Sequence, residues 1–552
     1  MRSCTIVALL LSRTAAFQSI KSARARMSAL AATAKPTTIV WLRDELRVHD
    51  NALLAEAAAR GGPVLPVYVL DDRVFDAAAT SESGGSRKCG AKRAKFTLEA
   101  LDDLRATLGA RGSGLVVERG RPADVLAGLC AAVGGDATVL CSDAACSEER
   151  KDEAAVAKVA PLAKVWEGTL YHPEDLRGVA FHDLFTAWRT KVEKAGTRVR
   201  GDVFPKTATL PAPPAGVDAK LAAPLPTLDA LGYDAADAAC DGRGDFFAPA
   251  GGETAALARL RKYVFEEDRL KDYFDTRNGM IGQGYSTKLA PWLSRGCVSP
   301  RAVARACADY ERTRGIKNKS TYWVVFELTW RDYFVFYAQK YGSKLFRPYG
   351  VKDIRERTWR ADPEALRRWK AGETGAPLVD ANMRELLATG FMSNRGRQNV
   401  ASYLVLDLGL DWRLGAEHFE EHLVDYTPEA NWGNWHAAAG LSGGRVNRFN
   451  ILKQSKDYDP KGDYVKLWIP ELAKVPAPQC FTPSSLSKAD REAAGAGDYP
   501  APLPTQGFKF PDGARPGKKS HQQDRKGKGG ERAQIQRKRK QKSRVQASAW
   551  AE

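Results

Sequence analysis

Residues 380–400 read DANMRELLATGFMSNRGRQNV, residues 407–413 read DLGLDWR and residues 425–435 read DYTPEANWGNW. The pattern predicts a helix over Gln398–Leu406 with cationic and amide side chains at its start. Trp412 and Trp435 are large, oxidisable side chains in segments that should be buried. So many polar groups beside so much indole are typical of a site for a flat aromatic ligand. A helical bundle with internal ion pairs explains the same composition, and these residues alone leave both interpretations open.

The length and the placement of charge limit the class of protein. A chain of 552 residues is too long for one hydrophobic core, so we expect two domains with extensions. The formal net charge is +18, but residues 1–36 hold six Lys or Arg and no acid, and residues 515–544 hold thirteen against two acids. The body, residues 37–514, carries only +2, so any DNA groove must arise from local clustering.

Cysteine usage argues against a disulfide scaffold and against a zinc site. The nine cysteines are scattered, with no CxxC pair and no Cys/His cluster at zinc-ligand spacing. The sequence therefore predicts buried thiols in a reducing compartment and no structural metal.

Both ends of the chain differ in composition from the body. Residues 1–36 are rich in Arg, Ser and Ala, and their apolar run is too short to span a bilayer. We expect a targeting segment for an organelle, with a disordered N-terminus as the alternative. Residues 476–552 are predicted to be a basic disordered tail. Its RKRK run at 537–540 suits nucleic acid or a nuclear import receptor, and a merely solvated tail is the simpler alternative.

The first domain, residues 37–200, is predicted to be α/β with a doubly wound, Rossmann-like parallel sheet. Short apolar runs alternate there with helical segments such as Asn51–Arg60 and Arg93–Leu108. No GxGxxG motif follows the first run, which disfavours a dinucleotide-binding dehydrogenase. The expected strands are Thr38–Trp41, Val64–Leu70, Leu115–Val117, Thr138–Cys141 and Lys164–Trp166.

The rest of the body is predicted to be a linker followed by an all-α domain. Residues 201–245 are rich in Pro, Ala and Asp, which is typical of a linker between domains. Residues 246–475 show helical patterns and hold most of the tryptophans. The clearest helices are expected over Glu253–Phe265, Pro300–Tyr310, Ser320–Tyr341 and Pro363–Lys370.

Two further segments carry chemistry. Ser286, Thr287 and Lys288 precede a predicted helix and suit a phosphate at its N-terminus, although ordinary helix capping needs the same residue types. In STYWVVFELTWRDYF, residues 320–334, helical spacing places Glu327 on one face with two tryptophans. A carboxyl group there would hydrogen-bond a flat, uncharged ligand such as a nucleobase, whereas the simpler alternative is a surface pair with Arg331.

These motifs together resemble the photolyase/cryptochrome family. The resemblance rests on WLRDELRVHDNALL near residue 41, TRNGMIGQGYSTKLAPWLSRGCVSPR, STYWVVFELTWRDYF, DLGLDWRLGAEHF and NWGNW. FMSNRGRQN and YDPKGDYVKLWIPEL are most similar to the cryptochrome DASH branch. The likeness covers residues 37–475 and implies an α/β antenna domain and a helical domain that binds FAD.

The resemblance also implies roles for individual residues. Glu327, Trp330 and Asn394 match the pocket for a cyclobutane pyrimidine dimer. Glu148 or Glu149 matches the glutamate that contacts a 5,10-methenyltetrahydrofolate antenna, with the register open by one residue. Trp435, Trp412 and Trp359 match the electron relay to the flavin, although spacing alone makes them core residues. The residues that match FAD contacts are Tyr273, Ser286, Thr287, Lys288, Arg397, Asp425 and Asn431.

The implied activity is blue-light-driven repair of cyclobutane dimers by a monomeric flavoenzyme, preferentially in single-stranded DNA, because flipping a dimer out of a duplex costs more. RNA is a further possible ligand, no membrane association is expected, and we expect a chloroplast or mitochondrion as the location, with the nucleus as the alternative.

Thr427, Ala437 and Ala290 depart from the family pattern. Ala437, where an aromatic normally supports the lesion, favours the main rival, a blue-light photoreceptor without repair. A nucleic-acid-binding protein that uses its basic tail is the third interpretation.

Overall fold

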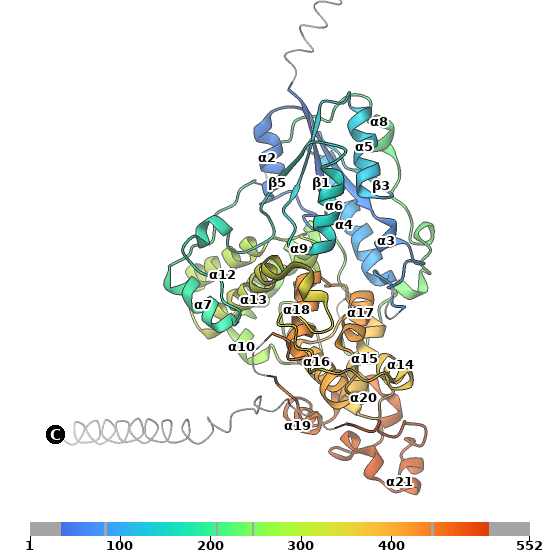
Figure 1. The fold of residues 1–552 in the computed structure, drawn as a ribbon. Helices are drawn as coiled ribbons and strands as arrows, with labels where there is room; N and C mark the ends of the chain where they lie inside the picture. The colour runs from blue at the N-terminus through green and yellow to red at the C-terminus, as the bar shows by residue number, and fades with distance from the viewer. Residues whose placement is uncertain (1–34, 82–84, 206–207, 246–247, 443–445, 507–552) are drawn as a thin grey trace, which may run out of the picture. The chain divides into compact units, whose positions relative to one another are not determined.

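The computed structural model describes residues 35–81, 85–205, 208–245, 248–442 and 446–506. The predicted targeting segment and the tail beyond residue 506, including RKRK, lie outside the described residues. Figure 1 shows a sheet with its helices at one end of the described chain and helices α14, α15 and α19–α21 towards the other end. Helices α12, α13 and α18 lie between them.

The N-terminal part is a five-stranded, fully parallel sheet with strand order β3-β2-β1-β4-β5. Alternate residues of a strand face opposite sides, and Ile39 and Trp41 pack in a core with Leu126 of α5 and Val156 of α6. Val40 on the other face is also fully buried, so both faces are covered. The predicted doubly wound α/β domain is confirmed. The strands and helices are β1 Thr37–Leu42, α2 Ala52–Arg60, β2 Val64–Leu70, α3 Asp72–Phe75, α4 Ala91–Gly109, β3 Val116–Arg119, α5 Pro122–Ala132, β4 Ala137–Ser142, α6 Ser147–Val156 and β5 Leu162–Val165.

The C-terminal part is helical, as predicted, with small differences at helix ends. Helix α16 begins at Asn394, before the predicted start at Gln398, because the Ser393 side chain caps it by accepting a hydrogen bond from the Gly396 N–H. The helices are α7 Phe185–Lys194, α8 Asp218–Ala222, α9 Glu253–Arg261, α10 Tyr273–Thr276, α11 Ala290–Ser294, α12 Pro300–Arg314, α13 Lys319–Tyr341, α14 Pro363–Ala371, α15 Pro377–Thr389, α16 Asn394–Ser402, α17 Trp412–His422, α18 Pro428–Ala438, α19 Ile451–Tyr458, α20 Asp463–Trp468 and α21 Lys488–Ala493.

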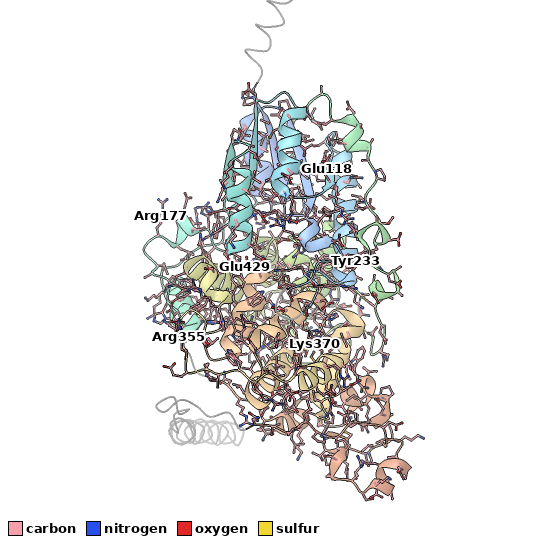
Figure 2. The ribbon with its side chains drawn as sticks, turned by 45° about the vertical axis from the view of Figure 1, so that its right-hand side comes forward. Glu118, Arg177, Tyr233, Arg355, Lys370 and Glu429 are labelled. Carbon is pink, nitrogen blue, oxygen red and sulfur yellow. The ribbon has the colours of Figure 1, made fainter. Side chains whose placement is uncertain are left out.

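The predicted linker, residues 201–245, packs against the α/β part. Val217 is fully buried in the core of the sheet, and the Tyr233 hydroxyl, in the segment labelled in Figure 2, donates to the backbone oxygen of Cys89 at 2.8 Å. The segment therefore packs on the α/β part through specific contacts, although its composition is that of a linker.

The prediction that the tail begins at residue 476 is wrong for residues 476–506. Phe481 and Tyr499 are buried in a cluster with Trp468. The Tyr499 hydroxyl donates to the fully buried carboxylate of Asp380 at 2.5 Å, and the Leu503 N–H donates to Thr374 O at 2.8 Å. The segment has little periodicity because a few widely spaced aromatic anchors, rather than a regular helix face, hold it.

A buried ion network joins the two parts. Arg301 of α12 donates to Asp50 at 3.1 Å and to Glu167 at 3.2 Å, and Arg47 donates to Glu167 at 2.8 Å. Burial would raise the pKa of the Asp50 carboxyl, but Arg301 and Ser299 outweigh burial, and the pKa is lowered. The carboxylates therefore stay ionised, and the network holds the loop before α2 against α12.

We expect Arg301→Met to lower the free energy of unfolding by about 3–5 kcal/mol. The change removes the nearest cation from the buried Asp50 carboxylate, which keeps only the longer contact with Arg305 at 3.4 Å, and leaves Glu167 with Arg47 alone. Denaturant unfolding followed by circular dichroism would measure the loss. The control is Arg312→Met on the same helix, whose pair with Asp309 is exposed and should contribute less than about 1 kcal/mol. Equal stability of the two variants would contradict this account of the interface.

Candidate functional site

Glu327 lies at the centre of a polar group on α13. Its carboxylate accepts a hydrogen bond from the Tyr273 hydroxyl and another from the Arg277 guanidinium at 3.3 Å. The guanidinium lies 4.9 Å from the Trp323 ring centroid. Burial raises the pKa of Glu327, opposed by Tyr273 and Arg277, although 39% of the side chain is exposed. The alternative of a surface pair with Arg331 is wrong, since Arg331 donates to the backbone oxygen of Gly168 instead.

The other two predicted pocket residues lie on α13 and at the start of α16. Trp330 is half-buried and stacks on Phe185 of α7, with ring centroids 3.6 Å apart. Asn394 is exposed, and its neighbour Arg395 donates to the Asn278 side chain at 3.0 Å. Because Asn278 follows the arginine that contacts Glu327, the loop after α10 brings the start of α16 towards the Glu327 carboxylate.

A second constellation joins the segment before α11 to the start of α16. The predicted ion pair is present, since Arg397 donates to both oxygens of Asp425, at 3.0 and 2.8 Å. The Phe391 ring lies 5.7 Å from the Arg397 guanidinium and 4.3 Å from the Lys288 ammonium, so two cations flank one ring. The Lys288 ammonium also donates to the Tyr285 hydroxyl at 3.2 Å.

Two ionisable groups of this constellation are strongly perturbed. Burial lowers the pKa of Lys288 to about 8, and the carboxyl of Glu385 opposes that shift. Burial raises the pKa of Glu385 to about 7, against a hydrogen bond from the Tyr464 hydroxyl. A lysine whose charged form is disfavoured by burial, beside an arginine, suits an anionic group, since a bound anion would stabilise the protonated ammonium.

Arg259 of α9 fixes the backbone of Ser286 and Thr287 by donating to their carbonyl oxygens, at 3.2 and 3.0 Å. Both side chains are half-buried and precede α11, as predicted. The Tyr273 hydroxyl is directed elsewhere, since it donates a hydrogen bond to the Glu327 carboxylate. Its ring instead contacts Tyr263, which the Arg259 guanidinium covers at 5.3 Å.

The three tryptophans predicted as an electron relay differ in burial. Trp435 and Trp412 are buried, whereas Trp359 is only half-buried. The indole N–H groups of Trp412 and Trp359 donate to the same oxygen, Pro348 O, at 3.2 and 3.3 Å. Trp435 packs against Gly415, one turn after Trp412 on α17, where any side chain would collide with the indole. The structure therefore brings together three residues whose spacing in sequence could not show contact.

Two amides near these rings are buried. Asn431, one turn before Trp435 on α18, donates to Ala416 O at 2.9 Å, which anchors α18 to α17. Asn399 on α16 is fully buried, and neither its amide nitrogen nor its oxygen has a hydrogen-bond partner among the described residues. An unsatisfied buried amide costs about 1–3 kcal/mol per group, so a ligand that pairs with it fits this part of the fold. Sequence reasoning missed Asn399, although it lies inside the FMSNRGRQN motif.

Comparison with known proteins gives the family. Residues 38–214 match the family described as DNA photolyase, and residues 323–506 match the family described as the FAD binding domain of DNA photolyase. A protein named cryptochrome DASH, chloroplastic/mitochondrial, from Ostreococcus tauri is 45% identical over 501 residues, which cover 84% of this chain and 89% of that protein. The chain belongs to the photolyase/cryptochrome family.

Further relatives place this family member among cryptochrome DASH proteins. Cryptochrome DASH from Xenopus laevis is 43% identical over 84% of this chain and 89% of its own length. The crystal structure of a Synechocystis cryptochrome is 40% identical, with a TM-score of 0.78 over 85% of this chain and 96% of that one. A class III photolyase from Agrobacterium tumefaciens is 27% identical, with a TM-score of 0.69 over 85% of this chain and 94% of that one. The helical part of this cryptochrome is thus an FAD-binding domain, and the constellation around Lys288 and Arg397 fits a phosphate-bearing flavin.

The two predicted antenna glutamates of this cryptochrome lie in different surroundings at the start of α6. Glu148 is exposed and pairs with Lys88 at 3.2 Å. One carboxylate oxygen of Glu149 is buried without a hydrogen-bond partner in the part of the chain that the structure describes. Burial and then Glu429 raise the pKa of Glu149 to about 8. Figure 2 labels Glu429, at the start of α18, below the sheet, so Glu149 faces the helical part.

No described helix combines the length and the apolar character that crossing a bilayer requires.

His436 is a second residue of this cryptochrome that sequence reasoning missed. It follows Trp435, is fully buried, and its ring lies 6.0 Å from Trp412 at an angle of 83°. Its Nε2 accepts the Val351 N–H at 3.1 Å, and burial lowers its pKa from 6.5 to about 4. The signal that could have found it is its place beside the relay tryptophan in NWGNWH.

We expect acidification to destabilise the fold partly through His436. The unfolded chain binds a proton at this residue below pH 6.5, whereas the folded chain does so only near pH 4, so stability falls as the pH drops through this window. Between pH 7 and 5, His436→Gln should lose on the order of 2 kcal/mol less unfolding free energy than the natural chain. Urea unfolding at both pH values measures the difference, and parallel losses in the two proteins would contradict the assignment.

Proposed function

We propose that this chain is an FAD-dependent photolyase that uses blue light to repair cyclobutane pyrimidine dimers, preferentially in single-stranded DNA. The observation that carries the proposal is the Glu327 group, a carboxyl with a raised pKa among Tyr273, Arg277 and Trp323. When bound, reduced and excited FAD would lend an electron to the dimer and take it back after the ring opens, so that no net redox change occurs.

The residues of the pocket have separate tasks in this proposal. Burial raises the pKa of Glu327, and in its protonated form the carboxyl would donate a hydrogen bond to a pyrimidine carbonyl where negative charge develops, which would stabilise that charge. Trp323 and Trp330 offer apolar faces to the flipped bases. Asn394, exposed at the start of α16, can reach the bases or the sugar-phosphate chain. Single strands are favoured because extruding a dimer from a duplex costs a few kcal/mol more.

Around the flavin, Lys288 and Arg397 would bind anionic and polar groups, with Ser286 and Thr287 held in place by Arg259. Asp425 fixes the Arg397 guanidinium. Trp359, Trp412 and Trp435 would carry an electron inward, from the half-buried residue to the innermost one. For the folate antenna, 5,10-methenyltetrahydrofolate, the buried oxygen of Glu149 is the better acceptor, and Glu148 is engaged with Lys88.

The alternative function is a blue-light photoreceptor with little repair. The exposed Ala437, where an aromatic side chain is expected to support the lesion, favours it.

We further propose a monomer that acts in a chloroplast or mitochondrion. The names of the relatives from Ostreococcus tauri, rice and Arabidopsis thaliana, each called chloroplastic/mitochondrial, support that location. Import of a fluorescent fusion of residues 1–36 into isolated organelles tests it.

Repair is tested with photoreduced protein and oligonucleotides that carry one cyclobutane dimer, in single- and double-stranded form. We expect repair of the single strand and at least about a tenfold loss in Glu327→Ala, because the carboxyl acts only as charge develops. Glu364→Ala, at an exposed position on α14, is the matched control and should repair normally. Photoreduction without repair of either substrate would leave the photoreceptor as the function.

The relay is tested separately by the rate of flavin photoreduction under blue light with an external reductant. Trp435→Phe should slow it by at least about tenfold, because phenylalanine is much harder to oxidise than the indole that it replaces. Trp468→Phe is the control, since this buried tryptophan belongs to the cluster around Tyr499 rather than to the relay. Equal slowing by both changes would reject the assignment of Trp435 to the relay.

A further inference from the structure

Helix α17 carries a group of possible metal ligands that the flavin chemistry does not use. Residues 418–422 read HFEEH, so His418, Glu421 and His422 stand at positions i, i+3 and i+4 and share one helix face. One ligand atom from each residue lies within 4.8 Å of the other two. The two imidazole rings are 4.5 Å apart, and His422 Nε2 is 3.8 Å from a Glu421 oxygen.

The state of His418 points to a missing partner. Its side chain is 97% buried, with 3% of its surface exposed. Its Nε2 atom is buried and has no hydrogen-bond partner within the described ranges of the chain. Leaving such an atom unpaired costs about 1–3 kcal/mol, which coordination of a metal ion would offset.

The group also has a route for an ion to enter. The side chains of His422 and Glu421 are 27% and 20% exposed, so the site opens to solvent on their side while His418 forms its floor. Three protein ligands with one open position are typical of zinc sites that keep a bound water. Small changes of side-chain rotamer would bring the three ligand atoms to the distances of about 2.0–2.2 Å that zinc requires.

The surrounding charges limit the kind of ion. Lys92, Lys370, Arg93 and Arg87 face His422, and Lys370, labelled in Figure 2, also faces His418. These cations repel a hard ion such as Mg²⁺ or Ca²⁺, whose binding is mainly electrostatic. Zn²⁺, Cu²⁺ and Ni²⁺ bind imidazole through stronger, more covalent bonds. The site therefore selects late transition metals, and with moderate affinity.

We propose that His418, Glu421 and His422 form a binding site for one late transition-metal ion, with Zn²⁺ or Cu²⁺ as the fitting ions. The site lies next to the relay, because the His418 ring is 5.6 Å from Trp369, whose ring is 6.0 Å from Trp435. A metal there would be separated from Trp435 by the Trp369 ring. The inference does not depend on repair activity.

The test uses the purified full chain with its flavin. Isothermal titration with ZnCl₂ should show one saturable site, and Cu²⁺ should give an electron paramagnetic resonance spectrum with nitrogen coupling from imidazole. His422→Ala and Glu421→Gln should each weaken Zn²⁺ binding by at least about tenfold. Both positions are partly exposed, so the variants should fold. Zn²⁺ should raise the Tm of the natural chain and not that of His422→Ala.

His172→Ala is the matched control, because His172 also lies beside a carboxylate, Glu174 at 3.6 Å, but on another part of the surface. It should bind Zn²⁺ like the natural chain. Absence of saturable Zn²⁺ binding would overturn the proposal, and so would binding that His422→Ala and Glu421→Gln leave unchanged.

Discussion

The ion network of Arg47, Asp50, Glu167 and Arg301 is the constraint on which the arrangement of the two parts depends. Buried charges are costly unless every one of them is paired, so the α/β part and the helical part fit together in the one arrangement that completes the network. Asp332 of α13 adds to it by accepting the N–H groups of Leu170 and Tyr171, both at 2.9 Å. The same helix carries Glu327, so the interface that joins the parts also fixes the pocket.

The constellation of Lys288, Arg397 and Phe391 follows a different physical rule. Lys288 and Arg397 are drawn from segments more than a hundred residues apart, and both lie over the Phe391 ring. An aromatic face tolerates two nearby cations better than an apolar one, because its quadrupole attracts each of them. Burial lowers the pKa of Lys288 and raises the pKa of Glu385. An anionic ligand beside Lys288 would stabilise its protonated ammonium, which fits a flavin phosphate.

Local pattern predicted the fold well where one periodicity dominates. Buried parallel strands appear as continuous apolar runs, and α13 appears as a long helix, so both were predicted close to their observed bounds. Residues 476–506 were misjudged because isolated anchors such as Phe481 and Tyr499 leave no periodic signal. The orientation of Glu148 and Glu149 could not be predicted, since adjacent residues at a helix start differ only in which way the fold turns them. His418 and His422 give no zinc-finger signal, because their HxxEH spacing on a helix differs from the spacing of Cys/His pairs in zinc fingers.

The residues proposed for repair and those proposed for photoreduction lie in separable parts of this molecule. The relay of Trp435, Trp412 and Trp359 is built from contacts among α17, α18 and the Pro348 carbonyl, and none of these involves Glu327. If the proposed function holds, loss of an aromatic support at Ala437 would weaken lesion binding without disturbing electron entry. A member of the family can keep its photochemistry while its pocket changes, because buried packing protects the relay, whereas Asn394 and Ala437 are exposed. The Glu327 carboxyl supports the proposal that this chain has kept both, since burial raises its pKa and a half-buried carboxyl has a cost that sensing alone does not require.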